Sequence, residues 1–410
     1  MTLSRRSLLA SSTAGSFMAL TPGVRVAFGA DAPAIGQNTA GQNIVVSLFL
    51  RFGMDGLQLL APAIDGNYRD KRPFMGVESE GLAAGYHLGA LNGTQLFLHP
   101  RAGGLKRFYD DKKLAFVHAA GVPTTSRSHF KDQDMLDKGM ADFEPDPNSG
   151  WLARHMNALA GDRGDFDAVV NGFGQSPSLV GFAGAVSFAD VGSFGGAIYG
   201  PFAEVLGKLN AGEGELRQSA QRSLAAIEGV RAKLNQSGFQ TPEDAGYTFG
   251  ALSQRLRPLA QLLKLDLGVR AATVDFGGWD HHDFLVESFG RQADELARAL
   301  TAFMRDLGPL AERVTVVAYS EFGRRVEENG NGGTEHGAGG VMMVLGGGVA
   351  GGRIYGEWPG LAPRDLDEGD LRVTTDYRRV LSEVLVKRHG QAAIESVFPT
   401  IPYRPLGIMI

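Results

Sequence analysis

Short apolar runs that alternate with longer helical segments are the feature that most constrains the fold of this chain. Each run is rich in Val, Ile and Ala and has no polar face, as expected for a strand that helices cover on both sides of a sheet. The runs cover residues 44–50, 114–119, 168–170, 272–276, 314–319 and 341–345. This alternation predicts an α/β fold with a mostly parallel central sheet and helices on both faces.

Between these runs lie segments in which apolar residues recur at helical spacing. They cover residues 132–138, 215–234, 252–267, 284–307 and 376–389. The glycine-rich stretch 171–200 lacks this spacing, so we expect a surface excursion or a cap over the crevice at the sheet edge. A chain of this length can form one large α/β domain with insertions or two domains. We expect a single domain over residues 43–410.

The N-terminus has the features of an export signal. Arg5 and Arg6 form a twin-arginine pair ahead of a weakly apolar stretch, and small residues follow where a peptidase can cut. An amphipathic first helix is the alternative, but the segment is rich in Ser, Gly and Ala. We expect residues 1–32 to be a signal peptide for the twin-arginine export machinery, and the mature protein to be periplasmic or secreted.

Composition excludes several classes of site and partner. The chain has no cysteine, so a disulfide, a thiolate metal ligand and a cysteine nucleophile are excluded, and any metal must be held by oxygen and nitrogen. A net charge of −5 without basic runs argues against nucleic acid or an anionic membrane as the main partner. No stretch after the signal approaches the roughly 18 apolar residues of a membrane span, so stable membrane insertion is not expected.

Acidic and histidine residues stand at the ends of the predicted strands. They are Asp55, Asp280, His282, Glu321, Glu335 and His336. Four of them follow the runs 44–50, 272–276 and 314–319, and two come just before 341–345. Loops at the carboxyl ends of parallel strands converge on one crevice, so residues far apart in sequence can meet there. Carboxylates and imidazoles that meet in one crevice predict a metal site.

Simpler interpretations of two of these motifs stay open. Asp55 lies in a glycine-flanked turn, where aspartate is common as a turn former. Asp280 and His282 are two apart on extended backbone, so they project to the same side and can bind one ion, whereas His281 points away. A solvated polar turn is the alternative for that motif.

The glycine-rich loop 329–340 carries Glu335 and His336. It is flexible enough to bring two ligands inward, but it can equally be a disordered surface loop. Glycine loses much backbone freedom when it is fixed, and the loop has little apolar surface to offset that loss. We therefore expect a bound ion to order this loop.

Arg127, Ser128 and His129 precede the predicted helix 132–138 and are the candidate catalytic residues. Ser128 can be a helix N-cap. The same position favours an anionic ligand and would stabilise an alkoxide nucleophile, because free amides and the helix dipole point toward it. Arg127 can add a bidentate contact to a phosphate or sulfate.

Several motifs together resemble a known secreted bacterial family, domain of unknown function 1501. They are RFGMDGL, RSHFKDQDMLDKG, GGWDHHDF, SEFGRRVEENGNGGTEHG and TTDYRRVL. The resemblance covers nearly the whole chain from about residue 43 onward. It implies an alkaline phosphatase-like fold of the phosphatase and sulfatase superfamily, whose members hold one or two divalent metals beside a Ser, Thr or modified Cys nucleophile.

The resemblance also implies roles for single residues. Asp55 is similar to the metal-bridging aspartate after the first strand, and Ser128 stands near the nucleophile position. Asp280 and His282 are similar to one metal's ligand pair.

Glu321 stands where the superfamily usually has an Asp-His pair, but Phe322 follows it. Either Glu335 and His336 replace that pair, or His336 is the later isolated histidine and the second metal is weak or absent.

The function expected from these features is metal-dependent hydrolysis of a phosphate or sulfate ester, with a small anionic or polymer-linked substrate. One or two divalent ions are expected, with Zn or Mn favoured by the histidines and Ca or Mg also compatible. The alternative is a non-catalytic binding or assembly protein for cell-surface polymers on the same fold. A Ser-His-Asp hydrolase using Ser128 is disfavoured, because the chain lacks a Gly-x-Ser-x-Gly elbow there.

Overall fold

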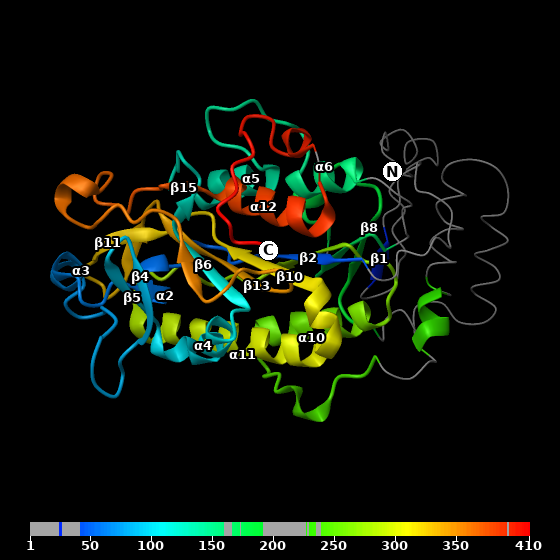
Figure 1. Cartoon of the computed structure of the whole chain (residues 1–410), viewed down its shortest axis with the longest axis horizontal. Coiled ribbons are helices and arrows are strands. Elements are labelled where there is room, and N and C mark those ends of the chain that lie inside the picture. Colours follow the sequence, from blue (N-terminus) through cyan, green and yellow to red (C-terminus); the bar gives the residue numbers. More distant parts are fainter. Residues whose placement is uncertain are drawn as a thin grey trace, which may run out of the picture.

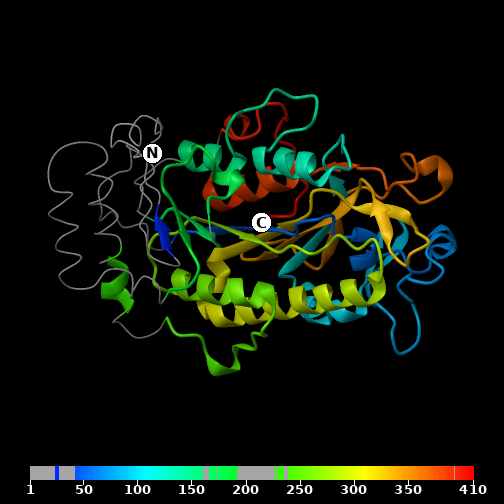
Figure 2. The same cartoon turned by 180° about the vertical axis from the view of Figure 1, so that it is seen from behind.

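A central ten-stranded sheet lies between two layers of helices in the computed structural model (Figures 1 and 2). The structure describes residues 24–26, 42–159, 166–172, 174–191, 227, 229–234, 239–391 and 393–410. Among these residues, no helix combines the length and the apolar character that crossing a membrane requires.

The six predicted apolar runs all form strands of the central sheet. They are β2 (Ile44–Phe49), β6 (Leu114–Gly121), β7 (Ala168–Asn171), β9 (Ala271–Asp275), β10 (Val314–Tyr319) and β13 (Gly340–Gly346). Nearly every residue in them is buried, because helices cover both faces of the sheet. The strand order is β1-β8-β7-β9-β2-β10-β13-β6-β14, with β15 beside β6.

The sheet is mostly parallel, which confirms the predicted fold class. β8, β7, β9, β2 and β10 pair in parallel, and β14 and β15 are parallel to β6. β13 is antiparallel to both β10 and β6, and β1 is antiparallel to β8. The amino end of β13 therefore lies at the same edge as the carboxyl ends of β2, β9, β10 and β6.

The two helical layers have separate apolar cores. Helices α5 (His129–Lys138), α6 (Trp151–Ala158) and α12 (Tyr377–His389) cover one face, and α4 (Gly103–Asp110), α10 (Ala251–Lys264) and α11 (Leu285–Leu307) cover the other (Figure 1). Trp151 and Leu381 belong to the first core, and Leu256 and Leu300 to the second. The helices predicted at 132–138, 252–267, 284–307 and 376–389 are confirmed. Of the helix predicted at 215–234, residues 229–234 are helical and most of the rest lies outside the described residues.

Smaller elements surround these layers. They are β1 (Val24–Val26), β3 (Leu60–Ala61), β4 (Tyr86–Leu91), β5 (Thr94–Leu98), β8 (Ala185–Phe188), β11 (Arg324–Glu328), β12 (Thr334–His336), β14 (Arg353–Tyr355), β15 (Thr375–Asp376), α2 (Gly56–Leu59), α3 (Gly66–Lys71), and 3-10 turns including η1 (Pro100–Ala102) and η2 (Pro177–Leu179). β3, β5 and β4 form a three-stranded sheet, and β11 pairs with β12.

The prediction that residues 171–200 form a surface excursion is wrong for Ala185–Phe188, which form β8, a buried strand of the central sheet between β1 and β7. The four residues of β8 include a serine and are too few to stand out among the surrounding glycines. Residues 192–200 lie outside the described residues. β1 falls within the predicted export signal 1–32, and the rest of that segment also lies outside them.

Buried histidines make the fold sensitive to acid. His118 on β6 is fully buried, its Nε2 donates to the Leu60 carbonyl at 2.9 Å, and burial lowers the pKa of His118 to about 4. In the unfolded chain a histidine titrates near pH 6.5, so between about pH 6.5 and 4 only the unfolded chain binds this proton. The free energy of unfolding therefore decreases as the pH falls through that range.

We expect His118 alone to lower the free energy of unfolding by about 2 kcal/mol between pH 7 and pH 5, at about 1.4 kcal/mol for each pKa unit. Urea unfolding at the two pH values measures this loss. His118→Gln keeps a donor for the Leu60 carbonyl and removes the titration, so it should flatten the pH dependence by about the same amount. An unchanged pH dependence in that variant would contradict the assignment.

Candidate metal centre

Three side chains from three different strand ends converge at the carboxyl edge of the central sheet. His129 begins α5 after β6, Asp280 follows β9, and His336 ends β12 just ahead of β13. One potential ligand atom from each lies within 4.8 Å of the others. The antiparallel direction of β13 brings His336 to this edge. These three residues, which we call the metal cluster, could hold a divalent ion.

His282 extends the cluster on its exposed side. Its Nε2 lies 3.0 Å from Asp280 Oδ1 and 3.0 Å from His336 Nε2. The prediction that Asp280 and His282 project to the same side is therefore confirmed. His281 turns the other way, against Trp279 and the neighbouring core, and burial lowers the pKa of His281 to about 4.

An acceptor orients each of the three imidazoles through Nδ1. Glu321 Oε1 lies 2.8 Å from Nδ1 of His129, the Arg127 carbonyl lies 2.8 Å from Nδ1 of His336, and Glu335 Oε2 lies 3.0 Å from Nδ1 of His282. A histidine whose Nδ1–H is donated to an acceptor presents a free lone pair at Nε2, which is the usual arrangement of a metal-binding histidine.

The Nε2 atom of His129 gives the sharpest test of whether the cluster fits a metal. It is buried and makes no hydrogen bond within the described chain, although it lies 3.3 Å from Asp280 Oδ1. A buried nitrogen left without a partner costs free energy. A cation between His129, Asp280 and His336 would satisfy this nitrogen, so the residues present fit a divalent ion.

Glu321 acts on the cluster through His129. The Glu321 side chain is fully buried and accepts hydrogen bonds from His129, from Gln133 Nε2 at 2.8 Å and from the Phe52 amide at 2.8 Å. Burial alone would raise the pKa of Glu321, but the hydrogen bonds from His129 and Gln133 outweigh it and lower the pKa. The sequence predicted a metal ligand here. The structure instead makes Glu321 a positioning carboxylate, because these three donors and Ser320 Oγ already occupy its oxygens.

Asp55 does not join the cluster, contrary to the metal-ligand prediction. Its carboxylate forms an ion pair with Arg72 at 2.9 Å, and both side chains are almost completely buried. The same carboxylate accepts the amide of Gln58 at 3.0 Å and caps α2. The turn-former interpretation therefore describes Asp55 better, because Arg72 from α3 supplies the buried counter-charge.

Arg324 is a residue of the site that the sequence interpretation missed. Its side chain is buried, and Nη2 lies 2.6 Å from Asp280 Oδ1. The guanidinium also donates hydrogen bonds to backbone carbonyls, including those of Gly53 and Thr334. Arg324 therefore connects three loops of the site. This guanidinium outweighs the effect of burial and holds the pKa of Asp280 well below its usual range. The signal in the sequence that could have identified Arg324 is its position, three residues after Glu321 at the end of a predicted strand.

The candidate catalytic residues ahead of α5 have different surroundings. Ser128 is exposed at the N-cap position and its side chain makes no capping hydrogen bond. Arg127 binds Asp370 at 2.6 Å and Glu368 at 3.3 Å, so its guanidinium is not free to grip an anion. His129, predicted as catalytic, belongs to the metal cluster instead.

Aromatic rings pack against the histidines of the cluster. Phe322 stacks on His129 with ring centroids 4.9 Å apart, and the same ring lies 4.9 Å from His336. Phe52 packs edge-on against His129 at 5.4 Å. Phe322 thus supports two residues of the metal cluster by packing against their rings.

The loop 329–340 is ordered by its own hydrogen bonds. β11 and β12 form a hairpin, and the Asn329 side chain donates to the His282 carbonyl and to Glu335 Oε1. These contacts do not test the expectation that a bound ion orders the loop, which stays a prediction.

Residues 117–382 match the model of a family described as "Protein of unknown function (DUF1501)". This is more than half of the chain. The chain belongs to this family. Among curated proteins, none matches it. Among solved structures, it is similar to the PsFucS1 sulfatase from Pseudoalteromonas sp., with 11% identity and a TM-score of 0.35, over 90% of this chain and 71% of the sulfatase.

In this DUF1501 protein, we expect Glu321→Gln to weaken metal binding about 10- to 100-fold, the usual effect of changing a residue that orients a metal ligand. The glutamine can still accept from His129 but carries no charge to strengthen the imidazole as a donor. Competition with a metal-sensitive dye measures the affinity. Glu327→Gln, which changes an exposed carboxylate on β11, is the matched control and should bind metal as the wild type does. Equal metal affinity in the two variants would show that Glu321 does not orient a metal ligand.

Proposed function

We propose that this protein is an exported, metal-dependent hydrolase of phosphate or sulfate esters on an alkaline phosphatase-like fold. The observation that carries the proposal is the convergence of His129, His336 and an ionised Asp280, with His282 alongside. Three imidazoles and one carboxylate favour Zn or Mn over Ca or Mg. Export rests on the twin-arginine pair of the N-terminus.

The cluster is accessible to a substrate. The Asp280 side chain is 41% exposed and that of His282 is 37% exposed. A divalent ion held here would act as a Lewis acid toward a phosphoryl or sulfuryl oxygen. The remaining positions around the ion would be open to solvent and substrate, as catalytic metal sites require.

Ser128 supports the choice of an anionic ester. It stands exposed at the start of α5, directly before the cluster residue His129. Free amides and the dipole at a helix N-terminus favour an anion and a developing alkoxide. These features suit the transfer of a negatively charged group to a serine hydroxyl.

One observation favours the second candidate, a non-catalytic binding or assembly protein for cell-surface polymers. The Arg127 guanidinium is bound by Asp370 and Glu368, so this residue offers no free cation to a transferred phosphoryl or sulfuryl group. Under this candidate, the protein holds a metal for structure or for binding an anionic ligand.

Metal analysis of the purified protein, followed by turnover of 4-nitrophenyl phosphate and 4-nitrophenyl sulfate with and without chelator, separates the two candidates. The proposal expects chelator-sensitive turnover of at least one ester. Ser128→Ala should then lower turnover by at least about 100-fold without loss of metal. Thr124→Ala, another exposed hydroxyl of the same loop, is the control. Bound metal with no turnover of either ester supports the binding protein.

A further inference from the structure

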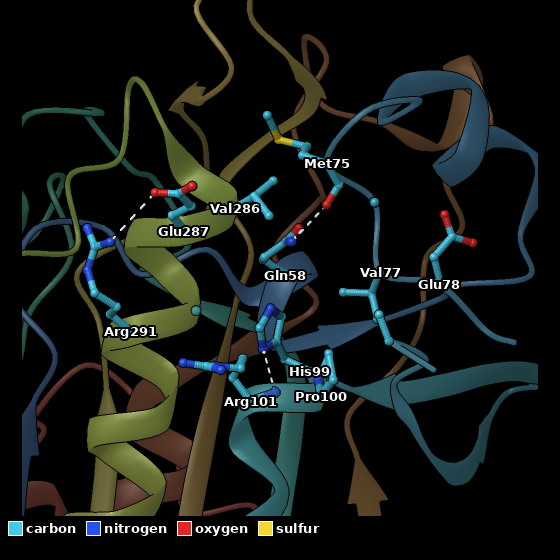
Figure 3. A pocket seen from close by; sticks show the side chains of 13 residues that line it. Gln58, Met75, Val77, Glu78, His99, Pro100, Arg101, Val286, Glu287 and Arg291 are labelled. Atoms are coloured by element: carbon cyan, nitrogen blue, oxygen red, sulfur yellow. Dashed lines mark hydrogen bonds and ion pairs between the residues drawn. The ribbon is translucent and has the colours of Figure 1, made fainter. Parts of the chain in front are cut away.

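A cavity separate from the metal cluster lies between α2, the segment after α3, η1 and the first turns of α11 (Figure 3). Its volume is about 470 Å³, within the usual range for small-molecule sites. Met75 and Val77 form one wall and Val286 of α11 the opposite wall. The walls are mainly apolar, so the cavity can take an apolar body.

His99 presents a hydrogen-bond donor to this cavity. The His99 side chain is buried, and its Nδ1 accepts the backbone amide of Arg101 at 3.2 Å. The proton of the neutral ring must then be on Nε2. Figure 3 shows this second ring nitrogen turned away from Arg101 and toward Gln58, and no partner for it occurs in the described chain. Burial, followed by the charge of Arg101, lowers the pKa of His99 to about 4, so the ring is neutral at pH 7.

The charges around the cavity leave one cation unpaired. Glu287 lies 3.8 Å from Arg291, and Glu78 lies 3.9 Å from Arg69, so both acids have a basic partner. The Arg101 guanidinium has no acidic partner in the part of the chain that the structure describes. Its aliphatic stem lies beside Gly290 of α11, and Arg101 is one of the residues that line the cavity.

We propose that this cavity binds a small carboxylic acid with an apolar body. The carboxylate would accept from His99 Nε2–H and lie close to Arg101, and the apolar body would contact Met75, Val77 and Val286. A buried neutral donor together with one nearby cation is the chemistry that recognises a carboxylate inside an apolar pocket. The site does not depend on the proposed hydrolase activity.

The cavity and the metal cluster are distinct but share supporting residues. None of the metal-cluster residues lines the cavity. The His99 ring packs on Phe289 at 5.2 Å, and Phe289 packs on His281 at 6.0 Å, next to Asp280 in the chain. Since carboxylates also bind metal ions, binding must be tested on protein from which the metal has been removed.

Calorimetric titration of the chelator-treated full chain with 3-phenylpropionate tests the proposal, with 3-phenylpropionamide and acetate as comparison ligands. We expect saturable binding of 3-phenylpropionate and at least about tenfold weaker binding of the neutral amide and of acetate, which lack the charge and the apolar body respectively. Arg101→Met and His99→Asn should each weaken binding at least about tenfold. Asparagine can still accept the Arg101 amide but cannot reach the cavity with a donor.

Arg107→Met is the matched control, because this arginine on α4 is exposed, pairs with Asp111 at 3.6 Å and does not line the cavity. It should bind 3-phenylpropionate as the wild type does. Thermal unfolding of each variant checks that it folds. The proposal is overturned if 3-phenylpropionate does not bind at millimolar concentration, if the amide binds equally well, if Arg101→Met leaves the affinity unchanged, or if chelation abolishes binding.

Discussion

Asp280→Asn is expected to weaken binding of the divalent ion by at least about 100-fold and to abolish any ester turnover that depends on it. Asp280 Oδ1 lies within 3.3 Å of His129 Nε2, His282 Nε2 and His336 Nε2, so it is the central atom of the site. Loss of its charge removes the anionic ligand, and removal of a ligand should exceed the 10- to 100-fold effect of changing a supporting residue. Elemental analysis and dye competition measure the affinity.

Asp283→Asn is the matched control, since Asp283 is an exposed carboxylate three residues further along the same loop. It should keep the wild-type metal content. Unfolding of the metal-free proteins should be compared as well, because Asp280→Asn also leaves Arg324 without its carboxylate partner. Full metal content in Asp280→Asn would refute the metal centre as described.

Arg72→Met is expected to lower the free energy of unfolding by about 3 to 5 kcal/mol. The Arg72 and Asp55 side chains are 0% and 1% exposed, so the substitution leaves a buried carboxylate without its counter-charge. Arg72 also donates to Gln58 Oε1 at 3.2 Å and to the Val326 carbonyl at 2.9 Å, and these acceptors lose their donor too. Urea unfolding of metal-free protein measures the loss.

Arg69→Met provides the comparison from the same helix. Its ion pair with Glu78 spans 3.9 Å at the surface, where such pairs contribute about 1 kcal/mol or less. If Arg72→Met lost no more stability than Arg69→Met, Arg72 would not be the essential counter-charge of Asp55. If added metal restored the stability of Arg72→Met, the ligand role predicted for Asp55 from the sequence would be supported.

The placement of the metal centre could be predicted from the sequence because it depends on topology. Asp280 follows one predicted strand, Glu321 follows a second, and His336 precedes a third. The carboxyl ends of parallel strands lie at one edge of the sheet. The two-residue period of extended backbone predicted that His282 lies beside Asp280. The sequence also placed His129 at this edge, but it was interpreted as a catalytic residue together with its neighbour Ser128.

Which carboxylate joins the metal cluster could not be predicted, because it depends on partners that come from distant segments. Asp55 and Glu321 both follow a strand, yet Arg72 neutralises the first, while His129 and Gln133 occupy the second. A sequence pattern shows where a charged group enters the crevice. It does not show which side chain from a distant segment will pair with that group.

The sequence by itself determined the α/β class, the six main strands of the sheet and the edge at which the acids and histidines meet. Burial on both faces selects unbroken apolar runs, and this signal is local. The tertiary structure alone decided the antiparallel direction of β13, the place of β8 in the sheet and the role of Arg324. These outcomes depend on pairing and counter-charge between segments far apart in the chain, which no local pattern of residues encodes.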